Sequence, residues 1–149
     1  MELSEIMTTD VVTAARDVPV DEIARTMRER GVGSVVITGP RGRPTAMITD
    51  RDLALRVLAA GSAGSSEAGD HATAPLVSAG PKTDLAEATA LMVRHRVRRL
   101  PVVDGDRLVG IVTLDDIAVR TGDLEAAREM TVDVIGSALP SFYFHDRRG

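Results

Sequence analysis

Hydrophobic positions along the chain recur with helical spacing in one segment and cluster like strands in the next. An apolar stripe at i, i+3, i+4 and i+7 predicts a helix that begins after Pro19 and ends at Gly31. The members of this stripe are Val20, Ile23, Ala24 and Met27. Two runs rich in valine, isoleucine and threonine follow at 34–38 and 45–49, which predicts two strands separated by a turn. A second helix is predicted over 50–59.

The same order of elements returns about 65 residues later. The second copy has a helix with the stripe Leu85, Ala88 and Met92, strands at 100–104 and 108–113, and a helix at 114–120. At an offset of 65, and of 64 after a one-residue deletion, identical residues match in order, such as Thr8 with Thr73, Val12 with Val77 and Thr49 with Thr113. Short extended segments at 11–13 and 76–78 precede the first helices. We therefore predict an α/β protein with tandem β-α-β-β-α repeats, related by a pseudo-two-fold axis.

The repeat divides the chain into four segments. We expect repeat one at 1–60, a small-residue linker at 61–70, repeat two at 71–122 and a tail at 123–149. The tail is predicted to begin as a helix and to end with all three aromatic residues of the chain, Phe142, Tyr143 and Phe144. Because large aromatic side chains are costly to leave in water, we expect this tail to pack on a surface.

Composition narrows the class of protein. The chain has 149 residues, of which 44% are hydrophobic and 27% charged, as in ordinary globular proteins. No apolar run approaches the roughly 18 residues of a membrane-spanning helix, and the acidic start predicts no signal peptide. The absence of cysteine excludes disulfides and a cysteine nucleophile and suits the cytoplasm, where we expect the protein. The three histidines lack metal-ligand spacing, so we expect no metal.

A Thr-x-x-Asp motif marks the junction between the last strand and the last helix of each copy. The two motifs are Thr49 with Asp52 and Thr113 with Asp116. Free N–H groups and the positive helix end favour anions at such a junction, and a carboxylate there can accept both hydroxyls of a ribose. The same spacing also forms a capping box. The two interpretations are compatible, because the threonine can cap the helix while the aspartate binds a ligand.

The doubled unit resembles the cystathionine-β-synthase (CBS) domain pair, or Bateman module. Val97–Asp104 with Leu108–Ile117 carries the resemblance in the second copy, and Gly31–Val36 with Ala46–Leu53 carries it in the first. It covers about residues 3–121, and the chain is similar to free-standing bacterial two-repeat proteins, including actinobacterial hypoxic-response proteins. The resemblance implies that adenine-containing ligands bind in the cleft between the repeats and that the Thr-x-x-Asp motifs contact ribose and phosphate.

Arg98 and Arg99 distinguish the two copies. The resemblance implies that basic residues here meet phosphates, whereas the first copy has the uncharged residues 33–34 at the same place. The alternative is that the two arginines are solvated surface residues. The first copy instead carries Arg51 inside its motif, where the second has Asp115. We therefore expect two unequal sites, of which the Asp116 site is the stronger.

The resemblance also assigns an apolar slot for adenine at each site. At the Asp116 site the slot residues would be Met7, Val12, Val32 and Ile111. At the Asp52 site they would be Met47, Val77 and Val97. The alternative is that these side chains belong to the ordinary core.

These observations predict a regulatory module that senses an adenine nucleotide (AMP, ADP or ATP) or another adenosyl compound without catalysis and with no required cofactor. The alternative is a structural homodimerisation or protein-interaction module with vestigial clefts. The resemblance implies a homodimer packed through its helices, and the contact residues expected are Ala24, Met27, Ala88 and Met92, with Leu53 and Val57 behind. The net charge of −4 makes nucleic acid an unlikely partner, and the basic run 94–99 lacks interleaved aromatic residues for base stacking.

Overall fold

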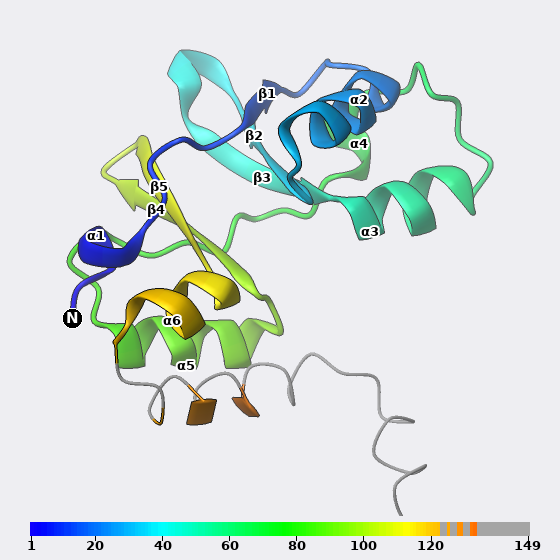
Figure 1. Ribbon diagram of the computed structural model, residues 1–149. Coiled ribbons are helices and arrows are strands. Elements are labelled where there is room, and N and C mark those ends of the chain that lie inside the picture. The colour runs from blue at the N-terminus through cyan, green and yellow to red at the C-terminus, as the bar shows by residue number, and fades with distance from the viewer. Residues whose placement is uncertain (123–124, 126–127, 130–131, 134–149) are drawn as a thin grey trace, which may run out of the picture. The chain divides into compact units, whose positions relative to one another are not determined.

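The computed structural model describes residues 1–122, 125, 128–129 and 132–133, and the chain forms two compact units (Figure 1). Unit A consists of Asp10–Val77 with Val103–Val109. Unit B consists of Met1–Thr9, Ser78–Val102 and the residues from Gly110 onward. Of the predicted tail, residues 125, 128–129 and 132–133 are helical, and the aromatic triplet lies outside the described residues.

Unit A is built on a three-stranded sheet. Its elements are β1 (Thr13–Ala15), α2 (Val20–Arg30), β2 (Ser34–Thr38), η1 (Pro40–Gly42), β3 (Pro44–Thr49), α3 (Asp50–Asp52), η2 (Leu53–Leu58) and α4 (Ala68–His71). The strand order is β1-β2-β3, with β1 parallel and β3 antiparallel to β2. Val36, at the centre of β2, pairs with Thr13 on one side and Met47 on the other. The two predicted strands of the first copy are therefore confirmed.

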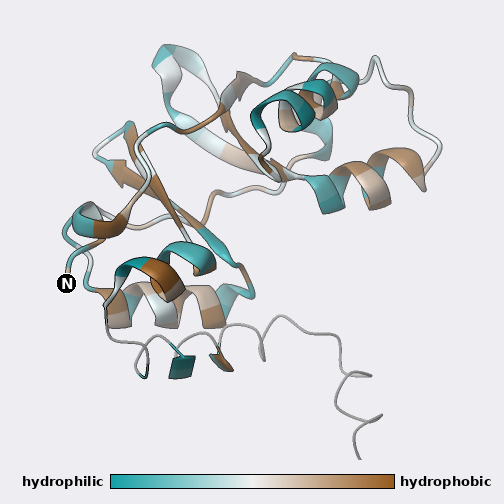
Figure 2. Cartoon of the chain, viewed as in Figure 1, coloured by the Kyte–Doolittle hydropathy of each residue, from teal (hydrophilic) through white to brown (hydrophobic). Residues whose placement is uncertain are grey.

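Three of the four predicted stripe residues of α2 pack on this sheet in the core of unit A, whereas Ala24 is exposed. Val20, Ile23 and Met27 are buried, and Figure 2 shows the hydrophobic face of α2 in brown. They share a cluster with Val35, Ile37, Ala46, Ile48, Val57 and Ala68. The helix ends at Gly31, whose φ of 64° is a left-handed conformation that glycine adopts without steric cost. Burying each large aliphatic side chain stabilises the fold by about 1.5–3 kcal/mol.

Unit B contains the corresponding elements of the second copy. They are α1 (Leu3–Ile6), α5 (Leu85–His95), β4 (Arg99–Asp104), β5 (Arg107–Thr113) and α6 (Leu114–Arg120), although residues 103–109, where β4 ends and β5 begins, are grouped with unit A. β4 and β5 pair with each other. The α5 stripe is buried as predicted, with Ala88 and Met92 both at 0% exposure. The predicted α/β fold with tandem β-α-β-β-α repeats is thus confirmed.

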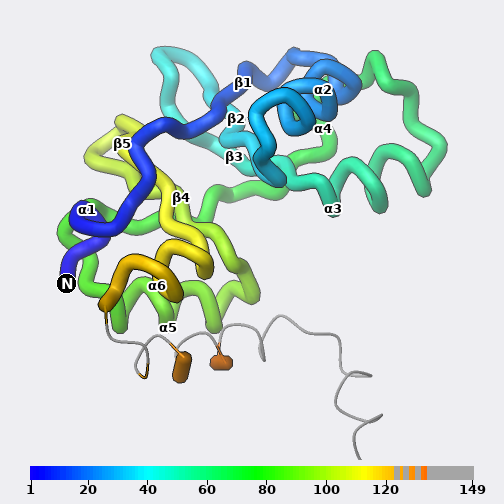
Figure 3. Tube along the Cα trace, viewed as in Figure 1, coloured from blue at the N-terminus to red at the C-terminus, as the bar shows by residue number. Residues whose placement is uncertain are grey.

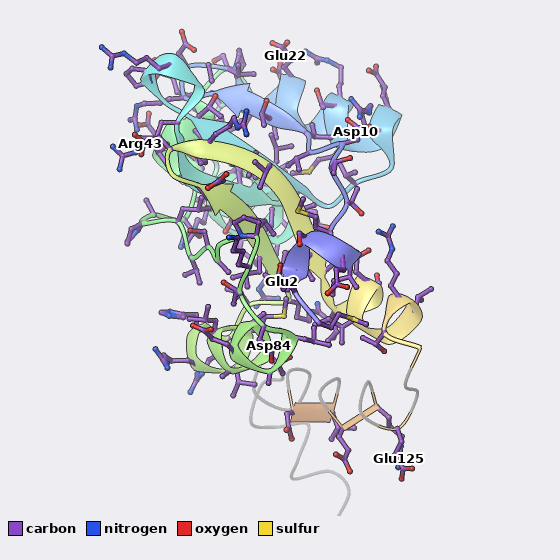
Figure 4. All side chains as sticks on the ribbon, turned by 90° about the vertical axis from the view of Figure 1, so that its left-hand side faces the viewer. Glu2, Asp10, Glu22, Arg43, Asp84 and Glu125 are labelled. Carbon is purple, nitrogen blue, oxygen red and sulfur yellow. The ribbon has the colours of Figure 1, made fainter. Side chains whose placement is uncertain are left out.

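The first segment of the chain is an integral part of unit B (Figure 3). Leu3 and Ile6 are 0% and 2% exposed, and the Leu3 N–H donates to the Thr83 carbonyl at 3.0 Å. Figure 4 shows Glu2 near Asp84, with which it forms a β-bridge at the start of α5. Residues 1–9 are therefore held by backbone pairing and by burial rather than trailing as a free end.

The equivalent segment of the second repeat lies in unit A. Thr8 pairs with Ile111 in unit B, and at the matched positions Thr73 pairs with Met47 in unit A. The backbone N–H of Thr8 donates to Ile111 at 2.9 Å and that of Thr73 donates to Met47 at 2.8 Å. Each unit therefore combines the first segment of one repeat with the strands and helices of the other.

Some element boundaries differ from the predicted ones. β1 begins at Thr13, where the chain comes into register with β2, rather than at residue 11. The segment 76–78 forms no strand, and only Ala79 bridges Val102 beyond it. The helix predicted over 50–59 is a short α-helical turn followed by the π-helix η2.

Part of the predicted linker 61–70 is structured. α4 starts inside it, and the Ala68 side chain is fully buried in the core of unit A. The Ala68 N–H donates to the Val18 carbonyl at 2.8 Å, and Ser66 accepts from the Val20 N–H at 2.9 Å. These bonds provide partners for backbone groups near the start of α2, where a helix leaves its first N–H groups without partners of its own.

Candidate ligand site

Thr113 and Asp116 form a capping box at the start of α6. The Thr113 Oγ1 accepts the Asp116 N–H at 3.2 Å. In return, the Asp116 Oδ2 accepts the Thr113 N–H at 2.8 Å and its hydroxyl at 3.0 Å. The capping interpretation is therefore confirmed for this motif. The second carboxylate oxygen, Oδ1, takes no part in the cap.

Thr49 and Asp52 form the same box at the start of α3. The three distances are 3.2, 2.9 and 3.1 Å. The side chain of Asp52 is 13% exposed and that of Asp116 is 12% exposed. Because the two motifs match in geometry and in burial, any difference between the sites must come from the residues around them.

Arg98 and Arg99 lie beside the Thr113 motif, as expected. They line a pocket of about 190 Å³ together with Thr113, Leu114 and Asp115. The Leu114 N–H donates to the Arg98 carbonyl at 3.0 Å, which ties the start of α6 to the residue before β4. Within the described part of the chain, neither arginine forms an ion pair. Two arginines and one acidic residue, Asp115, therefore line a polar pocket at a helix start, where the positive helix end and the excess of basic side chains favour an anion.

The first copy has the same backbone connection without these charges. The Asp50 N–H donates to the Gly33 carbonyl at 3.0 Å, as the Leu114 N–H does to Arg98. Ser34 follows Gly33, so no cationic side chain stands there. Arg51 is exposed, and its backbone N–H donates to the side chain of Asp50 at 2.9 Å. The first copy thus has no counterpart of the arginine pair at positions 33–34, and the arginine inside its motif is exposed.

Four of the predicted slot residues lie in the same unit as their assigned aspartate. In unit B, Ile111 alternates along β5 with the buried residues Gly110 and Val112, so it shares a face with Thr113. Met7 covers Gly110, since a Cβ built there would meet its Sδ at 2.5 Å. In unit A, Met47 shares a face of β3 with Thr49, and Val77 is half-buried.

The other slot residues belong to the opposite unit from their assigned aspartate. Val12 and Val32 are in unit A, where both are half-buried and pack against its core cluster. Val97 is in unit B and is also half-buried. None of the seven slot residues is fully buried, so they are not plain core positions. The residues gathered within unit B are Met7, Arg98, Arg99, Ile111, Thr113 and Asp116.

Two arginines that contact the motif aspartates were not among the predicted site residues. The Arg120 Nε lies 3.4 Å from Asp116 Oδ1, and the Arg56 Nε lies 3.6 Å from Asp52 Oδ1. Each arginine follows its aspartate by four residues, and the two align with each other at the repeat offset of 64. This i,i+4 spacing on one helix face was the available signal.

The described residues contain no group of three or more histidine, aspartate or glutamate side chains that would hold a metal ion. No helix among them is both long and apolar enough to cross a bilayer. A hydrogen bond from the Ala86 N–H, aided by the N-terminal ammonium, lowers the pKa of Asp84 below its ordinary value of 3.8. This carboxylate caps α5 and lies outside the pocket beside α6.

The fold and the two capped strand-to-helix junctions define a tandem-repeat α/β protein with a candidate anion site in its second copy. The chain belongs to the CBS domain family. The CBS domain matches residues 3–59 and again residues 68–120. The predicted family is therefore confirmed over both repeats.

Relatives include a bacterial CBS protein and a hypoxic-response protein. The CBS domain-containing protein YhcV of Bacillus subtilis is 38% identical over 84% of this chain and 89% of its own length. The crystal structure of Hypoxic Response Protein I, with two coordinated zinc ions, has a TM-score of 0.75 at 34% identity, covering 80% of this chain and 98% of that one. The predicted similarity to hypoxic-response proteins is thus confirmed.

A more distant structure shows the same fold. The CBS domain protein PAE2072 from Pyrobaculum aerophilum, complexed with AMP, has a TM-score of 0.76 at 24% identity and covers 87% of this chain and 99% of that one.

Proposed function

We propose that this chain is a regulatory CBS module that binds an adenine nucleotide without chemically converting it, and that the Asp116 motif in unit B is its stronger site. The observation that carries the proposal is the pocket at the start of α6, where two arginines without ion-pair partners in the described chain adjoin Thr113, the hydrogen-bond partner of Asp116. The proposal is that a phosphate binds Arg98 and Arg99 and that a ribose hydroxyl binds Asp116 Oδ1.

The base of a nucleotide needs an apolar surface next to this motif. Ile111 is half-buried and shares a face of β5 with Thr113, where it offers an aliphatic surface for the base, whereas Met7 packs over Gly110 on the other face. No aromatic residue precedes Phe142 in the sequence, so the base would be sandwiched by aliphatic groups rather than stacked on a ring. AMP combines a base, a diol and a phosphate, and PAE2072 has been crystallised with it, so AMP is the first probe.

A ligand panel tests the proposal. Thermal shift and calorimetry with AMP, ADP, ATP, S-adenosylmethionine and NADH should show binding of at least one compound. Replacing both Arg98 and Arg99 with alanine should weaken nucleotide binding by at least about tenfold to a hundredfold, the equivalent of losing one charge-assisted bond of roughly 1.5–3 kcal/mol. The matched control replaces Arg94 and Arg96, which are exposed and lie outside the pocket, and should change little. No binding across the panel would contradict the proposal.

The second candidate function is homodimerisation, with or without a ligand. The side chains of Leu58 and Val119 are 79% and 80% exposed, and Leu55 is 53% exposed, on the last helices of the two repeats. Large aliphatic residues grouped on helices are typical of protein interfaces. The contact residues expected from the sequence were wrong in part, because Met27, Ala88 and Met92 are buried within their own units. We propose a homodimer through Leu55, Leu58 and Val119, for which light scattering on a Leu58→Asp, Val119→Asp variant is the test.

A further inference from the structure

The number of acceptor positions on Asp116 limits how a ribose can bind there. A carboxylate oxygen has two lone-pair positions. Oδ2 uses both on Thr113, through bonds of 2.8 and 3.0 Å that complete the helix cap. Oδ1 makes an ion pair with Arg120, whose Nε lies 3.4 Å away, so a guanidinium group stands beside the one carboxylate oxygen that the cap leaves free. The two hydroxyls of a ribose need both positions on Oδ1, so they compete with this guanidinium for the same oxygen.

The contact with Arg120 is the one most easily lost. It is the longest of the three, and the arginine side chain is 47% exposed. Such half-exposed ion pairs contribute little net stability, typically under about 1 kcal/mol. Breaking a bond to Thr113 would instead leave a backbone N–H at the helix start without its acceptor.

Arg120 connects this carboxylate to the first segment of the chain. Its Nη1 donates to the Ile6 carbonyl at 3.0 Å and to the Met7 carbonyl at 3.4 Å. Its Nη2 lies 3.5 Å from the Thr8 hydroxyl. One guanidinium therefore joins the motif to residues 6–8.

We propose that Arg120 is a positioning residue through which ribose binding at Asp116 is transmitted to residues 6–8. When the second hydroxyl takes the second position on Oδ1, the guanidinium leaves the carboxylate and loosens its contacts with the Ile6 and Met7 carbonyls. A nucleotide with one hydroxyl takes only one of the two positions and leaves Arg120 in place. This inference rests on the proposed nucleotide site.

The first copy repeats the arrangement at the matched positions. Arg56 Nε lies 3.6 Å from Asp52 Oδ1, and its Nη1 donates to the His71 carbonyl at 3.4 Å. His71 aligns with Ile6 at the offset of 65. In both units, an arginine thus joins the motif aspartate to the first segment of the other repeat. The copy in unit A provides an internal control.

Hydrogen exchange with AMP and 2′-deoxy-AMP tests the proposal in the full chain. The readout is the exchange rate of the Met7 and Thr8 amides, which donate to Leu3 and Ile111 at 2.9 Å. At saturation verified by calorimetry, AMP should raise this rate by roughly threefold to tenfold, the equivalent of one modest hydrogen bond. 2′-Deoxy-AMP should leave it unchanged. Equal responses to both nucleotides, or no response to bound AMP, would overturn the proposal.

Two glutamine variants separate the role of Arg120 from a general loss of structure. In Arg120→Gln, the Met7 and Thr8 amides should exchange faster before nucleotide is added, AMP should add no further increase, and the ratio of AMP to 2′-deoxy-AMP affinity should rise roughly threefold to tenfold. Arg56→Gln should affect the Thr73 amide and leave Met7 and Thr8 unchanged. An Arg120→Gln variant that still responds to AMP contradicts the inference.

The outcomes also separate this inference from the proposed function. If calorimetry detects no AMP binding, the proposed site and the ribose-driven step both fail for this ligand. The comparison of wild type with Arg120→Gln in the absence of nucleotide still decides whether Arg120 holds residues 6–8. If Arg120→Gln does not fold, the comparison of AMP with 2′-deoxy-AMP on the wild-type chain decides the proposal by itself.

Discussion

Asp116→Ala and Asp52→Ala make a matched pair that separates stability from ligand binding. Each change removes an acceptor of two bonds to its threonine and an ion pair with an arginine four residues later. The remaining threonine N–H loses its partner at a largely buried position, which costs about 1–3 kcal/mol. For a chain of this size, we expect the melting temperature to fall by roughly 3–10 °C in either variant.

The two variants should differ in nucleotide affinity. Arg98 and Arg99 line a pocket with Thr113, the capping partner of Asp116, whereas Gly33 and Ser34 occupy the same positions in the first copy. If the nucleotide binds mainly where its phosphate meets both arginines, Asp116→Ala removes one or two bonds from the ribose of the bound ligand. The affinity for AMP should then fall about tenfold to a hundredfold, at 1.4 kcal/mol for each factor of ten.

Denaturant unfolding and isothermal calorimetry give the two measurements on the same samples. We expect equal losses of unfolding free energy, within about 0.5 kcal/mol, and unequal losses of affinity. Equal losses of affinity would refute the role assigned to the arginine pair. Unequal losses of stability would show that the two capping boxes, although alike in geometry, are supported differently by their units.

Three further predictions concern unit B. Gly110→Ala should lower the unfolding free energy by about 1–3 kcal/mol, because the new Cβ would meet the Met7 Cγ at 2.8 Å. In the same urea titration, the control Gly80→Ala should change the unfolding free energy little, since its nearest contact is at 3.8 Å. Leu3→Ala should cost about 2–5 kcal/mol, since this side chain is 0% exposed, and an unchanged urea midpoint would show that the first segment contributes nothing to the fold. The pKa of Asp84 is lowered in the folded chain, so the ionised carboxylate stabilises the fold. This stabilisation is fully present above pH 3.8 and is lost as the pH falls through the lowered pKa. The stability difference between wild type and Asp84→Asn should therefore shrink between pH 5 and the acid limit of about 2, and a difference that grows on acidification would refute the assignment.

Local sequence patterns predicted the parts of the site whose bonds span a few residues. The threonine and aspartate of each motif are three positions apart at a strand–helix junction, so the capping box follows from spacing alone. The strands at 34–38 and 100–104 were placed to within a residue, because branched aliphatic runs bounded by turns have few alternatives. The family resemblance then placed Arg98 and Arg99 beside Thr113, and the pocket contains all three.

Contacts between distant parts of the chain were not predictable in this way. Arg120 donates to the Ile6 carbonyl across 114 residues, and nothing in either local sequence specifies the other as its partner. The same holds for Met7 over Gly110, where the missing side chain of one residue provides the space for the other. Helical spacing identified Met27 and Met92 as apolar, but only packing decided that they face the core of their own unit rather than a dimer interface.

The sequence by itself thus determined the repeat, the order of its elements and the two capped junctions, because these depend on periodicity and on hydrogen bonds between near neighbours. Only the tertiary structure decided that the first segment of each repeat joins the strands and helices of the other. That exchange depends on which exposed strand edge and which apolar groove are left open once each unit has packed, as the pairing of Thr8 with Ile111 and of Thr73 with Met47 shows. Because two similar repeats offer similar edges, the choice depends on packing throughout both units rather than on any short stretch of residues.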